Sequence, residues 1–219
     1  MREPFFKRPF DIIFSFLGLL FSAWLWALIS VAIIIEDGFP VVIRQRRIGK
    51  HGKMFDSFKF RSMRKHTLSE RINSQAIERD PRTTFVGRCL RKCAFDELPQ
   101  LLNIFVGEMS FVGPRPLLPF ESEVFSNGGC LDIRKIPGYE KRITVRPGLT
   151  GLAQVYAERN IPRRHKFKFD LLYTKEMNLL LDLKLVLISF IVSFHCNWEN
   201  HSTKIEMLSR YRAIRTPSL

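Results

Sequence analysis

The amino-acid sequence predicts an α+β fold that is mostly helical, with a small β element and a membrane helix at the N-terminus. Three observations support this prediction. The run 12–35 contains no charged residue. The stretches 41–46 and 54–60 read as short strands around a turn that contains Gly49 and Gly52. Apolar residues recur at helical spacing in 84–93 and in 98–105, and 219 residues suffice for one substantial core.

The N-terminal run is long enough, as a helix, to cross a bilayer, and too long for the apolar part of a signal peptide. Basic residues flank it on both sides: Arg2, Lys7 and Arg8 before it, and Arg44, Arg46, Arg47 and Lys50 after it. The positive-inside tendency would place both flanks in the cytoplasm. Two topologies therefore stay open: a single-pass anchor, or a re-entrant helix that bends near Gly18 and Ser22 and returns.

The body of the chain shows local patterns in sequence order. Phe58 and Phe60 alternate with Lys59, which places Lys59 on the opposite face of the strand 54–60. Beyond it the patterns predict a polar loop or loose helix at 66–77, a helix at 84–93 and an irregular insertion at 120–141. They also predict a helix at 167–173 and an apolar helix at 179–194, which is either buried or at the bilayer surface.

The overall charge indicates anionic partners. Lys and Arg number 35 against 21 acids, a formal net charge of +14, which favours phosphates, anionic lipid headgroups or nucleic acid without choosing among them. The four cysteines form no C-x-x-C pair, so we expect buried thiols in a reducing compartment rather than a disulfide framework.

Two adjacent acids, Asp96 and Glu97, open the stretch FDELPQLLNIFVGEMSFVGPRPLL at 95–118. Asp96 is a suitable N-cap, Pro99 fits a first helical turn, and helical apolar spacing continues to Gly107. The acids are therefore predicted at a helix N-terminus, where the macrodipole favours negative charge. A purely structural interpretation also stands, in which Asp96 caps and Glu97 complements the dipole.

Basic residues around the two acids favour a functional interpretation. Arg115 lies between two prolines, which fix the backbone that carries it, and a rigid guanidinium fork suits a phosphate. Arg91 precedes the acids by about one and a half helical turns. An ionised Asp–Glu pair suits Mg²⁺, which takes one or two carboxylates together with substrate phosphates. The stretch thus predicts a metal–diphosphate site, although Arg115 could also be a surface arginine in a proline turn.

Three motifs resemble those of the monotopic phosphoglycosyl transferases, bacterial sugar transferases that begin glycan assembly on polyprenyl phosphate. They are KFRSM (59–63), DPRTTFVGRCLRKCAFDELPQLLNIFVGEMSFVGPRP (80–116) and VRPGLTGLAQV (145–155). The resemblance implies a re-entrant helix hairpin at 1–36 and a cytoplasmic catalytic domain at 37–219, with an interfacial amphipathic helix near 179–194. It implies the cytoplasmic face of the bacterial inner membrane. The family's Ser-Pro bend reads Ser22-Ala23 here, so we expect a shallower bend.

The resemblance also implies a reaction. The donor would be a nucleotide diphosphate sugar, usually a UDP-sugar, and the acceptor polyprenyl phosphate; the products are UMP and polyprenyl-diphosphate-sugar. Asp96 matches the nucleophile that carries the phosphosugar, and Glu97 matches the second acid, as a metal ligand, a positioning group or a general base, with Mg²⁺ bound by both. Matching positions expected to bind phosphate or nucleotide are Lys59, Arg91, Arg115 and Arg146. An anionic membrane surface is a further expected partner, nucleic acid is not, and a homo-oligomer stays open.

Two other classes of function are considered. A basic, membrane-anchored binding protein without catalysis would explain the charge, but it would not explain the adjacent acids Asp96 and Glu97, and the sequence has no nucleic-acid-binding motif. A soluble nucleotide-sugar glycosyltransferase would be expected to carry a D-x-D metal motif, which this sequence lacks. Release of UMP rather than UDP separates the expected reaction from both.

Overall fold

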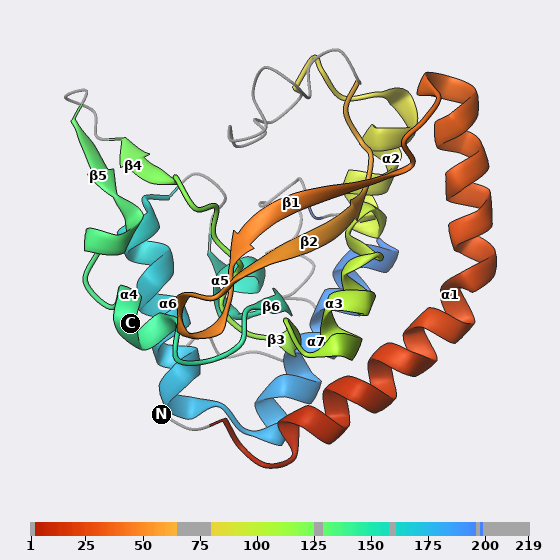
Figure 1. Ribbon diagram of the computed structural model, residues 1–219. Helices are drawn as coiled ribbons and strands as arrows, with labels where there is room; N and C mark the ends of the chain where they lie inside the picture. The colour runs from red at the N-terminus through yellow and green to blue at the C-terminus, as the bar shows by residue number, and fades with distance from the viewer. Residues whose placement is uncertain (1–2, 65–79, 125–128, 158–160, 196–197, 199–219) are drawn as a thin grey trace.

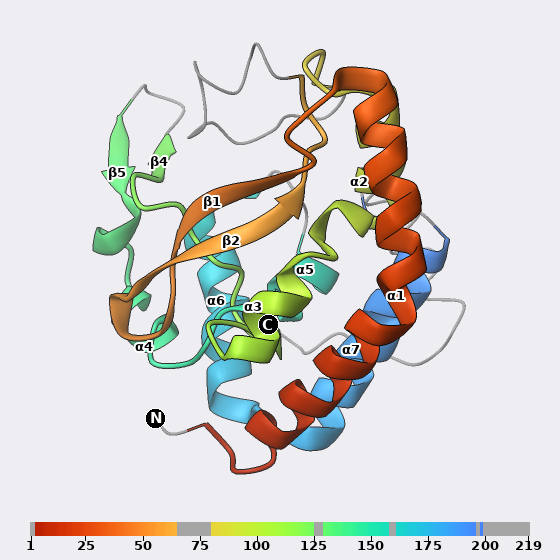
Figure 2. The same ribbon diagram turned by 45° about the vertical axis from the view of Figure 1, so that its right-hand side comes forward.

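The computed structural model describes residues 3–64, 80–124, 129–157, 161–195 and 198. A single long helix, α1 (Lys7–Asp37), follows one side of the molecule and curves around it, as Figures 1 and 2 show. It is the one helix in the described residues that is long and apolar enough to cross a membrane. The predicted loop at 66–77 lies outside the described residues.

A two-stranded antiparallel ribbon crosses the middle of the molecule (Figure 1). It consists of β1 (Val42–Ile48) and β2 (Met54–Phe60), joined by the short 3-10 turn η1 (Lys50–Gly52). The register pairs Ile43 with Lys59, which places Lys59 on the face opposite Phe58 and Phe60, as predicted. The strand prediction is confirmed, with β1 extending two residues beyond 46.

Further helices pack beneath this ribbon. In chain order they are α2 (Phe85–Cys93), η3 (Phe95–Glu97), α3 (Gln100–Val106), α5 (Leu152–Tyr156), α6 (Arg163–Glu176) and α7 (Leu179–Phe194). The predicted helices at 84–93, 167–173 and 179–194 are confirmed, the second within the longer α6. Between them β3 (Ser110–Val112) pairs in parallel with β6 (Gly148–Thr150). These strands approach so closely that a Cβ on Gly148 would lie 2.0 Å from the backbone nitrogen of Gly113.

The segment 120–141 is more regular than predicted. It contains the antiparallel pair β4 (Ser122–Val124) and β5 (Cys130–Asp132), followed by the short helices η4 (Ile133–Lys135) and α4 (Tyr139–Arg142). The prediction of an irregular insertion is wrong there, because strands of three residues are too short for apolar alternation to be recognised.

The cysteines also differ from the prediction. Cys89 and Cys130 are free but exposed, and Cys93 is disulfide-bonded. The expectation of buried thiols is therefore wrong at Cys89 and Cys130, which are exposed, and at Cys93, which is not a thiol.

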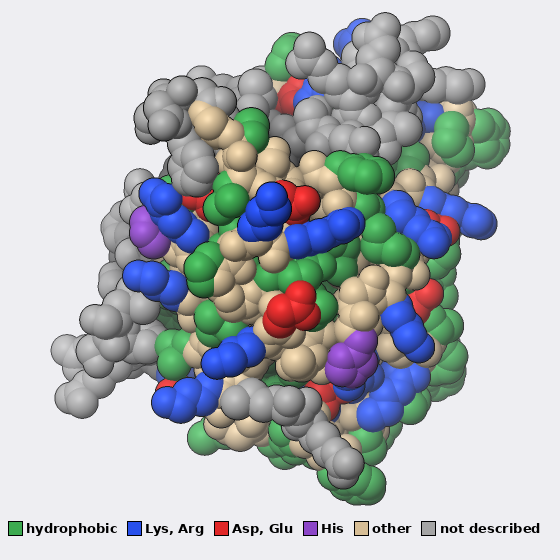
Figure 3. Space-filling model, turned by 60° about the vertical axis from the view of Figure 1, so that its left-hand side comes forward, with side chains coloured by type: hydrophobic (Ala, Val, Ile, Leu, Met, Phe, Trp, Pro, Cys, Tyr) green, Lys and Arg blue, Asp and Glu red, His purple; other side chains and the backbone are tan. Residues whose placement is uncertain are grey.

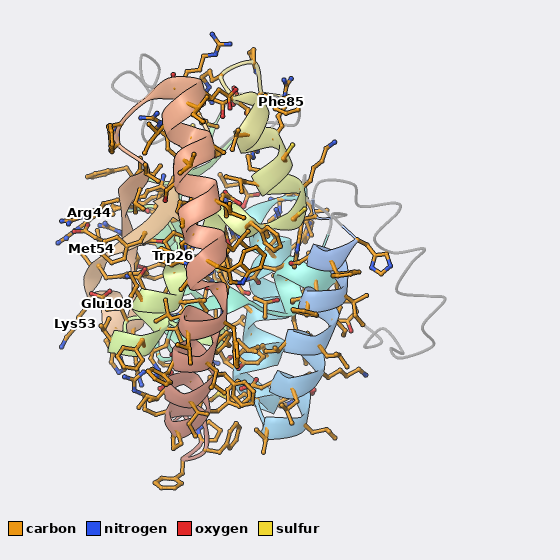
Figure 4. The ribbon with its side chains drawn as sticks, turned by 90° about the vertical axis from the view of Figure 1, so that its right-hand side faces the viewer. Trp26, Arg44, Lys53, Met54, Phe85 and Glu108 are labelled. Atoms are coloured by element: carbon orange, nitrogen blue, oxygen red, sulfur yellow. The ribbon has the colours of Figure 1, made fainter. Side chains whose placement is uncertain are left out.

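Both ends of α1 are hydrogen-bonded to the rest of the domain. At its first turn the buried Lys7 ammonium donates to Asp182 Oδ2 at 2.7 Å, Tyr173 OH at 2.7 Å and the Val112 carbonyl at 2.8 Å. At its last turn the Glu36 carboxylate accepts hydrogen bonds from the first two amides of α2, at 2.5 and 2.8 Å. Figure 4 faces α1 and shows the labelled Phe85, at the start of α2, beside this end.

The two residues predicted as weak points of α1 have other contacts. Gly18 lies against α3, where a Cβ would be 3.2 Å from Leu101 Cδ1, so this glycine permits close helix packing. Ser22 accepts a hydrogen bond from Trp26 Nε1 at 3.1 Å and does not bond back to the preceding turn. That bond is made instead by Ser15 and Ser30, to the carbonyls four residues earlier. The helix is unbroken from Lys7 to Asp37.

Candidate active site

A cavity of about 1000 Å³ lies between the ribbon, η3, α6 and α7. Asp96 and Glu97 line it, and so do three of the four predicted phosphate-binding residues, Lys59, Arg91 and Arg115. Cations outnumber acids on its walls; the remaining cations are Arg44, Arg47, Arg82, Arg142, Arg163 and Lys166. Figure 3 shows Lys and Arg side chains scattered over one face of the molecule. The cavity therefore suits a ligand with several negative charges.

The two acids sit in a turn between helices, and this corrects the predicted N-cap. The helix α2 ends at Ala94, which adopts the left-handed conformation with φ 57°, at a cost of about 1 kcal/mol for a residue with a Cβ. Asp96 and Glu97 follow in the 3-10 turn η3, and α3 begins only at Gln100, with no side-chain hydrogen bond at its N-terminal cap. Asp96 therefore does not cap a helix, and it lines the cavity instead. The predicted end of α3 at Gly107 is confirmed, with φ 97°.

Glu97 is held by two cations from separate parts of the chain. Its Oε1 accepts hydrogen bonds from Lys59 Nζ at 2.6 Å and from Arg115 Nη2 at 3.1 Å. Burial alone would raise the pKa of Glu97, but Lys59 and Arg115 together outweigh it and hold the pKa below its usual range. Glu97 is therefore ionised at neutral pH.

Asp96 has the opposite electrostatic environment. Burial raises the pKa of the Asp96 carboxyl; the Lys59 ammonium opposes this rise, and the negative charge of Glu97 adds to it. Within the described residues its carboxylate accepts no hydrogen bond. A carboxylate that is poorly solvated and has no fixed donor is a better nucleophile than one that is fully hydrogen-bonded.

The carboxylate pair fits a magnesium ion in its donor chemistry. Both Asp96 oxygens and one Glu97 oxygen are free of protein donors in the described residues, and these are the hard oxygen ligands that Mg²⁺ prefers. The described residues contain no group of three or more Asp, Glu, His or Cys side chains that could hold a metal ion. A cation here would thus depend on substrate phosphate oxygens to complete its shell.

The turn that carries Arg115 is held by two arginines that the sequence analysis did not identify as site residues. Arg47 Nη1 donates to the Pro116 carbonyl at 3.0 Å, and Arg142 Nη2 donates to the carbonyl of Arg115. Burial, and then the charge of Arg115, lower the pKa of Arg47 to about 10. These contacts are long-range, so no local pattern marks the two arginines. Arg91, by contrast, was predicted, and its Nη1 donates to Thr83 Oγ1 at 3.1 Å.

The structure does not bring Arg146 to this cavity. Its backbone N–H and guanidinium bond the Glu3 carboxylate, at 2.6 and 3.1 Å, and its Nη1 lies 3.4 Å from Asp11 Oδ2. The side chain is buried and its charge is compensated. In this structure Arg146 ties the N-terminus to the loop before β6.

The fold and the site define a class of protein: an enzyme with a long apolar N-terminal helix and a cationic cavity that contains two adjacent carboxylates. The family model for bacterial sugar transferases matches residues 2–196. The chain belongs to the bacterial sugar transferase family and, with it, to the phosphoglycosyl transferases.

Relatives of two lengths support this assignment. The exopolysaccharide production protein ExoY of Rhizobium meliloti is 38% identical, over 82% of this chain and 81% of its own. The UDP-glucose:undecaprenyl-phosphate glucose-1-phosphate transferase of Escherichia coli is 36% identical, over 86% of this chain and 40% of its own. The undecaprenyl-phosphate galactose phosphotransferase of Salmonella typhimurium is 34% identical, over 83% and 39%. The chain thus spans about two-fifths of the two enterobacterial relatives.

Proposed function

We propose that this protein transfers a sugar-1-phosphate from a UDP-sugar to polyprenyl phosphate, through a covalent aspartyl-phosphosugar, and releases UMP. The observation that carries the proposal is the contrast between the two adjacent carboxylates. Lys59 and Arg115 hold Glu97, whereas Asp96 accepts no hydrogen bond from the described residues and lines a cavity in which cations predominate. The names of the relatives support a sugar phosphate as the group transferred and an undecaprenyl phosphate as the acceptor.

The proposed chemistry has two displacements at phosphorus. An Asp96 oxygen attacks the β-phosphorus of the donor, the bond from that phosphorus to the bridging oxygen breaks, and UMP leaves with the electron pair. An oxygen of polyprenyl phosphate then attacks the same phosphorus, and the Asp96 carboxylate is the leaving group. Arg115 and Arg91 offset the negative charge of the transferred phosphoryl group. Glu97 keeps Lys59 and Arg115 at the position where that group is bound.

We also propose that Mg²⁺ belongs to the active enzyme. Asp96 and Glu97 would hold it, because they are adjacent and present carboxylate oxygens that have no donor among the described residues. Bound there, it would supply charge neutralisation to the diphosphate. The protein's own cations already provide part of this effect.

The attachment of α1 supports a re-entrant, cytoplasmic arrangement. Lys7 at one end of α1 and Glu36 at the other bond residues of the same domain, which supports a topology with both helix ends on one side of a bilayer. Large apolar side chains are exposed on α1, α3 and α7; the most exposed are Phe21, Trp24, Ile35, Val106, Leu180, Phe190 and Phe194. We propose that α1 enters the cytoplasmic leaflet of the inner membrane and returns, with its curvature in place of a proline bend. The cationic body would then rest on anionic headgroups.

The first test is the Asp96→Asn variant, with donor labelled at the β-phosphate. It should lose several orders of magnitude of UMP release and form no labelled protein, because an amide does not act as the nucleophile. Asp56→Asn is the matched control, since Asp56 lies exposed on the ribbon and should retain wild-type rates. A labelled Asp96→Asn protein, or a tenth of wild-type activity, would contradict the assignment. A basic binding protein without catalysis would release no UMP in any variant.

A further inference from the structure

The helix α7 presents one complete face to the cavity. Val186, Ser189, Phe190, Ser193 and Phe194 all line it, at the spacing of one helical face. The residues that pack into the protein core lie on a different face, at Leu185, Ile188 and Val192. The helix therefore has a core side and a separate cavity side.

The cavity side of α7 is apolar but is not covered by the described protein. Phe190 is 68% exposed and Phe194 is 77% exposed, although both line the cavity. The apolar residues Phe95, Leu98 and Leu101 also line the cavity. Leu98 directly follows Glu97, so this apolar arm of the cavity begins one residue from the two acids.

The rest of the cavity has the opposite character. On the side of β1 and α6 its walls carry Arg47, Arg163 and Lys166. Glu121 pairs with Arg163, and Arg47 has no acidic partner in the described structure. This cationic arm suits a nucleotide diphosphate, whereas a hydrocarbon gains nothing from it. The two acids have neighbours of both kinds, because Glu97 accepts hydrogen bonds from Lys59 and Arg115 and is followed in the chain by Leu98.

We propose that the apolar arm along α7 binds the first isoprene units of the polyprenyl acceptor, with the acceptor phosphate toward Asp96. This inference rests on the proposed function and adds the location of the lipid. A ligand with an anionic head and a hydrocarbon tail matches a site whose charge and apolar surface are divided in this way. The same helix also exposes Leu183 outside the cavity, toward which the rest of the polyprenyl chain would extend to the bilayer.

The experiment separates the two half-reactions. Phe190→Ala and Phe194→Ala are compared with Leu187→Ala, which removes a 61% exposed apolar side chain from the same helix without touching the cavity. Single-turnover UMP formation without acceptor measures the first displacement. Steady-state turnover against undecaprenyl phosphate, in vesicles of fixed composition, gives the KM for the acceptor. All three proteins are also compared by thermal unfolding and by the fraction that stays with the vesicles.

We expect Phe190→Ala to raise the acceptor KM roughly tenfold, because a large buried contact with the lipid is lost. Single-turnover UMP formation should stay at the wild-type rate, and Leu187→Ala should change neither quantity. Phe194→Ala should change the acceptor KM in the same direction. Equal acceptor KM values for Phe190→Ala and Leu187→Ala would overturn the inference, and so would an equal loss in both half-reactions. A wild-type protein that forms no UMP would overturn the proposed function as well, so the two failures are distinguishable.

Discussion

Replacing Lys59 by methionine should move the acid limb of the pH–rate profile toward higher pH. Lys59 Nζ lies 2.6 Å from Glu97 Oε1, and its charge is the largest of those that oppose the raised pKa of Asp96. In the proposed mechanism Asp96 must be deprotonated to attack phosphorus, so the rate should fall as the pH falls through its pKa. Methionine keeps most of the apolar stem and removes the positive charge.

The size of the shift follows from the surroundings of the pair. The Lys59 and Glu97 side chains are each 14% exposed, so solvent screens the ammonium only weakly. An opposite charge at close range lowers a carboxyl pKa by about 1 to 3 units. Without Lys59 the two carboxylates also repel each other more strongly, which raises the pKa of Asp96 further. We therefore expect the acid limb to move upward by about 1 pH unit or more.

The assay is single-turnover UMP formation as a function of pH, with the position of the limb as the measured quantity. A lower rate at every pH is also expected, because Lys59 lines the phosphate site, but this would not by itself support the reasoning. Lys59→Arg keeps the charge and should leave the limb in place. Lys53→Met, at an exposed position at the end of the same ribbon (Figure 4), should match the wild type. An unchanged limb in Lys59→Met would refute the electrostatic role given to this lysine.

Three further expectations can be tested directly. Arg115→Lys keeps the charge but loses the planar fork, so we expect a loss of roughly tenfold or more in kcat/KM; Arg46→Lys, in an exposed pair, is the control, and an equal rate in the two would return Arg115 to a surface role. Excess EDTA should abolish UMP release and Mg²⁺ restore it, whereas full activity in chelator would remove Mg²⁺ from the mechanism. Single cysteines at Phe5 and Phe39, which are 94% and 68% exposed, in a background without the native cysteines, should both be labelled from the cytoplasmic side only; periplasmic labelling at position 5 alone would show a spanning helix.

Local patterns in the sequence predicted most of the regular structure. Apolar periodicity and helix-ending glycines are signals that span only a few residues. They predicted the two strands of the ribbon, α2, the end of α3 at Gly107 and the limits of α7. The predicted cap at Asp96 failed because Ala94 takes the left-handed conformation that ends α2. That turn moves the start of the next helix beyond Pro99, and the residue types alone do not show it.

The candidate site was predictable only in part, because some of its contacts span the whole chain. The acids, Lys59, Arg91 and Arg115 were found from motifs and from proline-fixed geometry. Arg146 was placed by resemblance, yet its partner Glu3 lies 143 residues away in the sequence. Arg47 appeared in the sequence only as one of several basic residues after the apolar run, and its contact with Pro116 depends on tertiary packing.

The buried pair between Lys7 and Asp182 has a consequence for how the chain is synthesised. Its members are 175 residues apart, so the first helix emerges from the ribosome long before its counterion exists. Until α7 has been made, Lys7 must remain exposed to water, because a buried ammonium without a counterion is strongly disfavoured. Docking of the first helix is therefore a late event in biogenesis. A polypeptide that stops before α7 should reach the membrane with its first helix undocked, which would mark it for proteolysis.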